Sequence, residues 1–398
     1  MKPSLVYVAT GVMLLQQALS TMAGLSMPVL VPPIAAGTGL DPSLIGLFVP
    51  LVYGGSMVSS IASGGMLLRF GAFRVSQLCL LATSAGMLLC ATGHMATFVI
   101  GGIILGIGNG PSTPAGSHVL ARYTTPKNAP MMFSLKQTGV PVGGMMAGTL
   151  LPIFVIYFGW RGALVCAAAM SLAFVAFAQP LRREFDSDRQ SGRSLRMLDV
   201  RATLMTVLRD VRIRELAITI FVFTGLQITF ASFFVAFLSL RLGWTLTEAG
   251  VAYSVAMVSG IVFRIVWGWL AARFIEPAYM LALLGAGMGG ALIAVAFVEP
   301  GWSRYAVWGV AMLFGATGIG FQGVLLAEIA RLAPHGMAGV ITGGTVFFAF
   351  VGMILFPAVF GAMLSFGGSY EAVFAIAGGP PMLVAIMLFV AARRRAPA

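Results

Sequence analysis

Twelve stretches of almost uninterrupted hydrophobic residues follow one another along the chain, separated by short segments that contain charged residues, glycine or proline. A helix needs roughly 20 mostly apolar residues to cross a bilayer, because its backbone must satisfy its own hydrogen bonds there. The pattern therefore predicts an all-α membrane protein with twelve transmembrane helices. We place them near residues 5–34, 43–67, 75–92, 96–119, 130–157, 162–179, 215–240, 249–271, 278–297, 305–330, 338–365 and 372–392.

The composition agrees with this pattern. Only 9% of the residues are charged and 59% are hydrophobic, whereas a soluble domain carries roughly 25% charged residues. The first hydrophobic stretch is too long for a cleaved signal peptide and lacks a strongly basic start, so we interpret it as helix one. Cys79, Cys90 and Cys166 all lie inside apolar stretches. We expect them to be small core residues, without disulfides or a metal.

The formal net charge of +12 is distributed unevenly. If both termini are cytoplasmic, the inner loops hold 19 lysines and arginines and the outer loops hold 3. Such an excess is the positive-inside pattern of a multi-pass protein. It predicts a bacterial inner membrane protein with both termini in the cytoplasm, surrounded by lipid, and gives no reason to expect a nucleic-acid partner.

Residues 180–213 form the one long polar stretch and divide the chain into two halves. We expect a six-helix bundle over 1–179, a cytoplasmic linker over 180–213 and a second six-helix bundle over 214–398. The residues from Leu195 to Leu208 keep helical hydrophobic spacing, which favours an amphipathic helix at the inner surface. The halves resemble each other, since three residues recur 204 positions later: Gly46, Gly64 and Arg69 as Gly250, Gly268 and Arg273.

Three motifs resemble those of the major facilitator superfamily, and the resemblance extends over essentially the whole chain. "GGMLLRFGAFR" at 64–74 is similar to the signature after helix two, "GIGNGPSTP" at 106–114 to the helix-four motif, and "GVPVGG" at 139–144 to the helix-five motif. The resemblance implies secondary transport by alternating access between two pseudo-symmetric bundles. It implies loop and gating roles for Gly64, Arg69, Gly71, Arg74, Gly268 and Arg273, and a helix-five role for Gly139, Pro141, Gly143 and Gly144. The usual loop aspartate is absent, because Leu68 and Ala272 stand at its two positions.

Polar residues are distributed unevenly among the expected helices. Helices six, nine and twelve are almost free of them and are expected to face lipid, whereas helices one, four, five, seven and ten carry several. The candidates for a substrate path are Gln16, Gln17, Asn109, Gln137, Gln227 and Gln322. The alternative is hydrogen bonding between helices, which such side chains commonly provide in membranes.

Two cations stand inside the expected helices: Lys136 in helix five and Arg264 in helix eight. Glu328 is the one clear carboxylate candidate within the helices, so the interior should carry positive potential and favour an anionic substrate. Lys136 could instead reach the membrane surface, and Arg264 could pair with Glu328 or backbone carbonyls. The position of Arg264 also resembles the substrate arginine of monocarboxylate and oxalate carriers within the superfamily.

We therefore predict a monomeric secondary transporter of a small organic anion, with Arg264 and Lys136 as its cationic groups. Proton symport would use Glu328 or His118. There is no P-loop, no nucleophile–base arrangement and no histidine cluster, so we expect no enzyme activity, cofactor or metal. One alternative is an exporter of drugs or apolar metabolites, favoured by the 24 methionines and 29 phenylalanines. Another is a non-transporting membrane sensor on a carrier scaffold, favoured by the missing loop aspartates.

Overall fold

The computed structural model describes residues 3–39, 48–190 and 200–395, and within these ranges the regular elements are helices, with no strand. The first half contains α1 (Pro3–Thr38), α3 (Phe48–Phe70), α4 (Ala72–Cys90), α5 (Met95–Asn109), α6 (Ser112–Tyr123), α7 (Ala129–Gln137), α8 (Gly139–Ala178), η1 (Gln179–Leu181) and α9 (Arg182–Phe185). The second contains α10 (Val200–Arg209), α11 (Val211–Leu242), α12 (Leu246–Arg273), α13 (Pro277–Ala296), α14 (Arg304–Phe314), η2 (Gly315–Ile319), α15 (Gln322–Leu332), α16 (Ala338–Ser365), α17 (Tyr370–Ala377) and α18 (Gly379–Arg395).

Eleven helical runs in the described residues are long and apolar enough to span a membrane. The longest of them, Ala129–Phe185, has 57 residues, well over twice the roughly 20 residues that one span needs. It is bent at Gly159, where φ is 67° and ψ is 174° inside α8. Glycine adopts this backbone conformation without the steric clash of a Cβ atom. Because α8 consists of two helices joined at this bend, the expectation of twelve spans is confirmed.

Some spans expected to be continuous are broken in the structure. The expected helix 96–119 is divided into α5 and α6 at Gly110 and Pro111, and the expected helix 372–392 is divided into α17 and α18 at Gly378. Proline removes a backbone donor and clashes with the preceding turn, which explains the break beside Pro111. The expected helix 305–330 contains the π-helical turn η2, described below.

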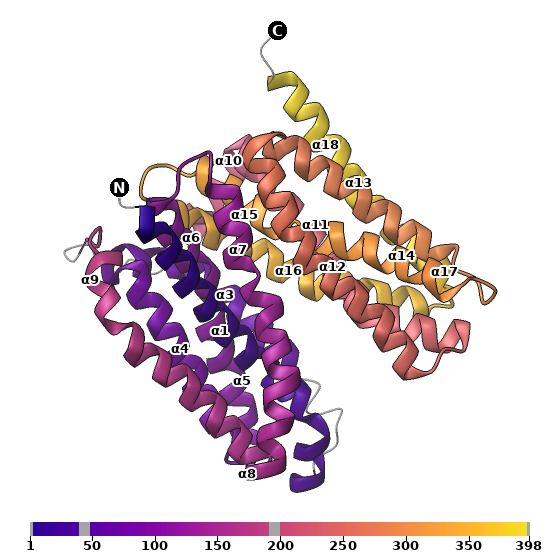
Figure 1. Ribbon diagram of the computed structural model, residues 1–398, viewed down its shortest axis with the longest axis horizontal. Coiled ribbons are helices and arrows are strands. Elements are labelled where there is room, and N and C mark those ends of the chain that lie inside the picture. Colours follow the sequence, from indigo (N-terminus) through magenta and orange to yellow (C-terminus); the bar gives the residue numbers. More distant parts are fainter. Residues whose placement is uncertain (1–2, 40–47, 191–199, 396–398) are drawn as a thin grey trace. The chain divides into compact units, whose positions relative to one another are not determined.

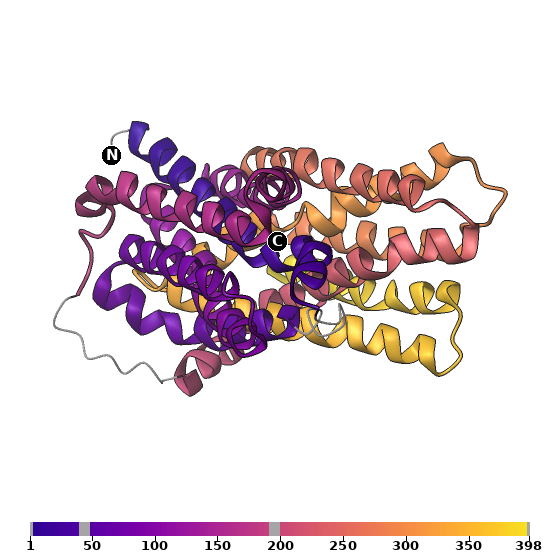
Figure 2. The ribbon, with the colours of Figure 1, turned by 90° about the horizontal axis from the view of Figure 1, so that it is seen from below.

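The chain folds into two compact units, shown in Figures 1 and 2. The first comprises Met1–Thr125, Lys136–Arg209 and Ile329–Phe347, and the second comprises Pro126–Leu135, Asp210–Glu328 and Phe348–Ala398. In the first unit α1 packs along α8, and α4 packs along α5. In the second unit α13 packs along α18, and α12 packs against η2 and α14. Each unit thus takes a short segment from the other half of the sequence. The predicted division at 180–213 stays a prediction.

The contact between α1 and α8 depends on two residues of the helix-five motif. A Cβ atom on Gly139 would overlap the carbonyl oxygen of Leu14, and one on Gly143 would overlap that of Ala18. Small residues allow helix backbones to approach closely where no hydrophobic effect drives association. These two glycines therefore set the distance between the helices, whereas a Cβ atom on Gly144 would make an ordinary contact with Leu25 at 3.7 Å.

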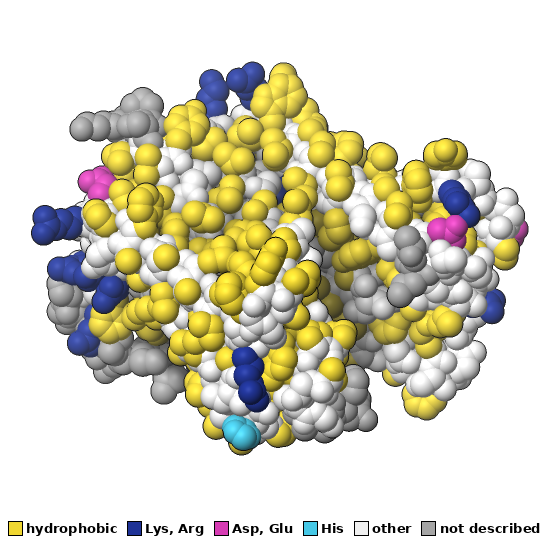
Figure 3. All heavy atoms as spheres, turned by 60° about the horizontal axis from the view of Figure 1, so that its bottom comes forward, with side chains coloured by type: hydrophobic (Ala, Val, Ile, Leu, Met, Phe, Trp, Pro, Cys, Tyr) yellow, Lys and Arg dark blue, Asp and Glu magenta, His cyan; other side chains and the backbone are white. Residues whose placement is uncertain are grey.

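Large apolar side chains cover much of the molecular surface, as the yellow side chains in Figure 3 show for one face. Phe177 is 82% exposed and Ile156 is 79% exposed, and both lie on the long α8 helix. Exposing such apolar surface to water costs a free energy of roughly 25 cal/mol per Å². Lipid chains cover them instead, in agreement with a multi-pass membrane protein.

The amphipathic helix expected over 195–208 corresponds to α10 (Val200–Arg209), and residues 195–199 lie outside the described ranges. Val207 is fully buried, and a Cβ atom on Gly344 of α16 would contact its side chain. Met205 and Leu208 of the same helix are exposed. One face of α10 therefore packs within the first unit.

Candidate functional site

Lys136 lies at the end of α7 and is only 1% exposed. Its Nζ atom donates hydrogen bonds to Gln17 Oε1 at 2.7 Å and to Gln137 Oε1 at 2.8 Å. A Cβ atom on Gly116 of α6 would lie 2.7 Å from Lys136 Cε, so the glycine leaves room for the lysine side chain. The cation is therefore held in the interior of the first unit by side-chain amides.

A polar network extends from this lysine along α1 and α6. Ser112 Oγ donates to Gln16 Oε1 at 3.1 Å, and Thr113 Oγ1 donates to Gln17 Oε1 at 3.3 Å. Further along α1, Ser20 Oγ donates to Asn109 Oδ1 at 3.0 Å. The structure thus brings together five of the predicted residues in one unit: Gln16, Gln17, Asn109, Lys136 and Gln137.

Arg264 lies on α12 and is fully buried in the second unit. Its Nη2 atom donates to the carbonyl oxygen of Ile319 at 2.6 Å and to Gln322 Oε1 at 3.3 Å. Gln322 Nε2 in turn donates to Gln227 Oε1 at 3.2 Å. The three residues predicted for this half therefore form one hydrogen-bonded chain from α11 through α15 to α12.

The π-helical turn η2 explains why Arg264 finds a backbone acceptor inside a helix. In this turn Gly320 N donates to Gly315 O, five residues back, which breaks the regular series of bonds. Trp267 Nε1 donates to the carbonyl oxygen of Ala316 at 2.7 Å. Two side chains of α12 thus bind carbonyls that the turn exposes. Sequence reasoning missed Trp267 and the interruption of this helix, for which the glycines at 315, 318 and 320 were the available signal.

The predicted loop and gating residues contact other parts of their own units. A Cβ atom on Gly64 would contact Val340 at 3.0 Å, and one on Gly268 would overlap Ser134. The Arg69 guanidinium lies 5.7 Å from the ring centroid of Phe70, and that of Arg273 lies 5.8 Å from that of Trp269. Gly71 and Arg74 contact a carboxylate that is described below.

The two proton-coupling candidates occupy different units. Glu328 is buried in α15 of the second unit. His118 is buried in α6 of the first unit, and its Nε2 atom lies 2.8 Å from Asp188 Oδ2. Asp188 also binds Arg122 Nη1 at 2.7 Å. Burial alone would raise the pKa of Asp188, but the hydrogen bond and charge of His118, together with Arg122, outweigh burial and lower it.

Neighbouring Asp186 is perturbed in the opposite direction. It is 4% exposed and accepts hydrogen bonds from the backbone N–H groups of Phe73 and Arg74. Burial raises the pKa of this carboxyl, and the two backbone bonds and Arg182 offset burial only in part. Sequence reasoning assigned the acidic residues at 184–188 to the linker. It did not predict the contacts of Asp186 with α4 or of Asp188 with α6. In the described parts of the chain, no group of three or more metal-ligating side chains gathers in one place.

A comparison with known protein families identifies the family of this chain. A model of the Major Facilitator Superfamily matches residues 12–357, most of the chain. The chain belongs to this superfamily. Proteins of the superfamily are transporters of small molecules and not enzymes. The predicted family, fold class and transporter character are therefore confirmed.

Two curated relatives carry substrate names. Monocarboxylate transporter 13 of Bos taurus is 26% identical over 300 residues, which cover 74% of this chain and 68% of the relative. The 4-hydroxybenzoate transporter PcaK of Acinetobacter baylyi is 26% identical over 141 residues, which cover 34% of this chain and 30% of the relative. Both names describe carriers of organic acids.

Solved structures share the fold at low sequence identity. The fucose:proton symporter FucP of E. coli superposes with a TM-score of 0.77 at 16% identity, covering 99% of this chain and 100% of that one. The human organic anion transporter MFSD10 superposes with a TM-score of 0.74 at 16% identity, covering 98% and 100%. At this identity the likeness establishes the fold alone.

Proposed function

We propose that the protein is a secondary transporter that moves a small organic anion, in the first instance a carboxylate, across the membrane by alternating access. The observation that carries the proposal is the pair of buried cations. Lys136 is 1% exposed and Arg264 is 0% exposed, and each lies among side-chain amides of its own unit. We propose these two residues as the substrate-binding cations.

The physical reason lies in the groups around each cation. Removing an ammonium or guanidinium group from water costs several kcal/mol, and hydrogen bonds to amide oxygens offset part of this cost. A carboxylate brings a full negative charge and two acceptor oxygens, which a guanidinium can bind bidentately. The amide side chains can then turn to donate to the substrate.

Gln16 offers a donor of this kind. Its Oε1 atom accepts from Ser112, whereas its buried Nε2 atom finds no hydrogen-bond acceptor among the described residues. An unsatisfied buried donor costs roughly 1–3 kcal/mol, so a group that satisfies it gains that amount. A substrate oxygen near α1 would supply the acceptor.

The relatives support the same substrate class. Their names describe carriers of a monocarboxylate and of 4-hydroxybenzoate. The two names have the carboxylate in common. The carboxylate is therefore the feature that we carry over to this chain.

Four further features belong to this proposal. The chain acts as a monomer and lies in a bacterial inner membrane with both termini in the cytoplasm, as its loop charges favour. Protons drive transport by symport, with Glu328 or His118 as the coupling group. Fusions of a reporter enzyme to the chain ends test the topology. Flux measured with and without an imposed pH gradient tests the coupling.

Uptake into proteoliposomes tests the substrate class. The panel pairs lactate with lactamide and 4-hydroxybenzoate with 4-hydroxybenzamide, because each pair differs mainly in the negative charge. We expect uptake of the acids and not of the amides. Arg264→Gln and Lys136→Gln should each raise the KM for the acid roughly 10- to 100-fold, the loss that corresponds to one hydrogen bond with a charged group.

Arg394→Gln is the matched control, since this arginine is exposed near the end of α18. It should leave the KM unchanged. Equal uptake by wild type and Arg264→Gln, with both proteins folded, would rule out the anion-binding role. Export of apolar dyes without acid uptake would favour the exporter. Ligand binding with no flux of any solute would favour the sensor.

A further inference from the structure

An aspartate far away in the sequence caps the first turn of α4. The N-cap residue of this helix is Gly71, which has no side chain to accept a hydrogen bond. Asp186 Oδ1 instead accepts from Phe73 N at 2.8 Å, and Asp186 Oδ2 accepts from Arg74 N at 3.0 Å. These are the two backbone donors that an N-cap side chain normally satisfies.

Gly71 provides the space for this carboxylate. Its φ angle is 93°, and a Cβ atom at this position would overlap the Asp186 side chain. Any other residue at position 71 would therefore displace Asp186. The glycine of the loop motif and the aspartate after α9 are parts of one arrangement.

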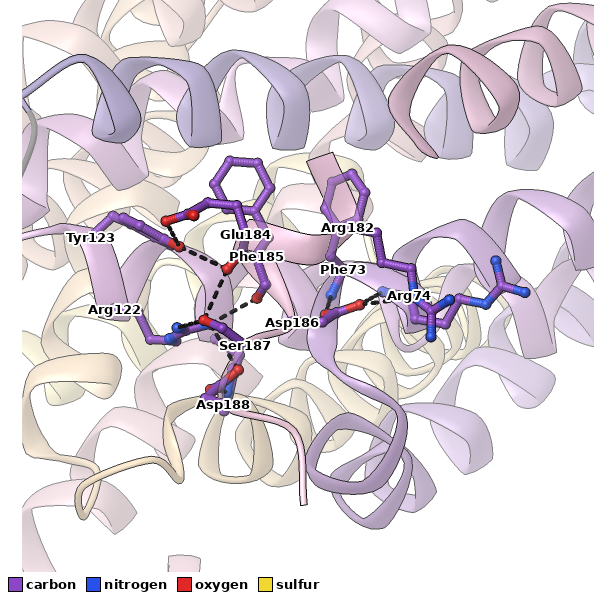
Figure 4. Close-up of polar contacts among 11 residues, drawn as sticks. Phe73, Arg74, Arg122, Tyr123, Arg182, Glu184, Phe185, Asp186, Ser187 and Asp188 are labelled. Atoms are coloured by element: carbon purple, nitrogen blue, oxygen red, sulfur yellow. Dashed lines mark hydrogen bonds and ion pairs between the residues drawn. The ribbon is translucent and has the colours of Figure 1, made fainter. Parts of the chain in front are cut away.

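The same segment also contacts the ends of α3 and α6. Gln190 N donates to the carbonyl oxygen of Leu68, in the last turn of α3, at 2.8 Å. Phe185 is fully buried, with ring centroids 5.4 Å from Phe73 and 5.3 Å from Tyr123 of α6. Tyr123 Oη donates to the carbonyl oxygen of Glu184. Figure 4 shows these side chains near the turn that follows α9.

Asp188 makes the strongest contacts with α6. Its two oxygens bind His118 at 2.8 Å and Arg122 at 2.7 Å. Arg122 also donates to the carbonyl oxygen of Phe185 at 2.7 Å and to Ser187 Oγ at 2.8 Å. One carboxylate and one guanidinium thus hold about one turn of α6 against residues 185–188 (Figure 4).

The other end of α6 reaches Lys136. Gly116 lies two residues before His118 and packs against the lysine side chain. Ser112 and Thr113 donate to Gln16 and Gln17, and Gln17 accepts from Lys136 Nζ. A shift of α6 along its axis would therefore change the contacts of Lys136.

We propose that residues 182–190 form a clasp that holds the ends of α3, α4 and α6 as one block and thereby fixes α6 at the register required by Lys136. Asp186 and Asp188 are its positioning residues. The inference rests on the proposed function, because it assigns Lys136 to substrate binding. It adds a group of residues that contacts no substrate and still sets substrate affinity.

A structural role limited to capping α4 makes a different prediction, and two variants separate the two. Asp186→Ala removes the cap and the connection to the segment together. Arg122→Ala leaves the Asp186 cap of α4 in place and removes the bonds from α6 to Phe185, Ser187 and Asp188. Asp210→Ala is the matched control, because Asp210 caps α11 in the same manner through Arg212 N and Ile213 N.

The readouts are the KM and Vmax of 4-hydroxybenzoate uptake, the unfolding midpoint, and hydrogen exchange of the amides in 112–123. We expect Asp186→Ala to raise the KM about tenfold, which corresponds to the free energy of roughly one hydrogen bond. Arg122→Ala keeps the cap of α4 and should still show the raised KM and fast exchange in 112–123. Asp210→Ala should lower the midpoint and leave the KM unchanged.

Asp188→Asn should also raise the KM. Asp188→Glu retains the carboxylate and should give a KM between those of the wild type and Asp188→Asn. A wild-type KM in Arg122→Ala, or in Asp188→Asn, would overturn the clasp. If the wild type transports no carboxylate, the proposed function fails and the exchange data still decide. Slow exchange in 112–123 in Arg122→Ala would then overturn the clasp on its own.

Discussion

Two carboxylates separated by one residue illustrate how local contacts decide the properties of single side chains. Asp186 is enclosed by protein and accepts only backbone hydrogen bonds at short distance, so burial dominates and its pKa is raised. Asp188 is less enclosed and faces His118 and Arg122, so its pKa is lowered despite burial. As the pH falls, Asp186 should therefore become protonated before Asp188.

Asp188 should contribute stability that disappears only in strong acid. Because its pKa is lower in the folded state than in the unfolded chain, the contribution is complete above about pH 4, the ordinary value of an aspartate. It is lost as the pH falls through the folded-state pKa. Asp188→Asn should lower the unfolding midpoint by about 2 °C at pH 7, since a partly exposed ion pair contributes less than about 1 kcal/mol.

The measurement is a thermal unfolding series of wild type and Asp188→Asn in detergent between pH 7 and pH 3. The difference between the two midpoints should shrink below pH 4. A difference that stays constant down to pH 3 would contradict the lowered pKa.

Helix ten shows how a helical element is interrupted within a membrane. Non-helical backbone is tolerated there only where other groups satisfy its polar atoms. The π turn η2 is followed by two residues outside the α-helix before α15 begins at Gln322. The carbonyls of Ala316 and Ile319 accept from Trp267 and Arg264. The interruption between α14 and α15 therefore depends on side chains of α12 that satisfy its carbonyls.

Trp267→Phe should destabilise this interruption, because it removes the indole N–H and retains most of the ring. We expect a loss of about 1 kcal/mol, typical of one hydrogen bond, measured as a lower unfolding midpoint in denaturing detergent. Trp269→Phe is the control, since Trp269 is 41% exposed on the same helix. Equal midpoints for wild type and Trp267→Phe would show that the bond to Ala316 contributes nothing.

Both compact units of the molecule draw on both halves of the sequence. The first unit includes residues 329–347, where the carbonyl oxygen of Gly343 accepts from Ser60 Oγ at 3.1 Å and Val340 packs against Gly64. The second unit includes residues 126–135, where Ser134 packs against Gly268 and Gly323. A fragment cut at the linker therefore lacks part of its own packing.

Expression of residues 1–209 alone should consequently yield an unstable product. Co-expression with residues 210–398 should restore its amount and a monodisperse elution profile, measured by fluorescence-detected size exclusion. Ser60→Ala in the full chain serves as the control for loss of a single hydrogen bond and should change little. An equally stable and monodisperse 1–209 fragment would contradict this expectation.

The hydrophobic pattern sufficed to predict the helices, because lipid imposes a length and a composition on every span. Lys136, Gln17 and Gln137 could be grouped from the sequence only as polar residues in spans, and their mutual bonds required coordinates. The break at Gly159 falls at the predicted boundary between the spans 130–157 and 162–179. The π turn was not predicted, since side chains of α12 satisfy the carbonyls that it exposes. Asp186 and Asp188 were missed for a related reason: their hydrogen-bond partners lie 66 to 113 residues away.

The capping of α4 by Asp186 also orders events during synthesis. The ribosome adds 113 more residues after Phe73 before the carboxylate exists, which takes roughly 6 to 20 s at about 5–20 residues per second. Until then the amino end of α4 keeps two backbone donors without their acceptor. The helices on either side of this loop enter the membrane early, but their junction reaches its final form only after the sixth span has emerged.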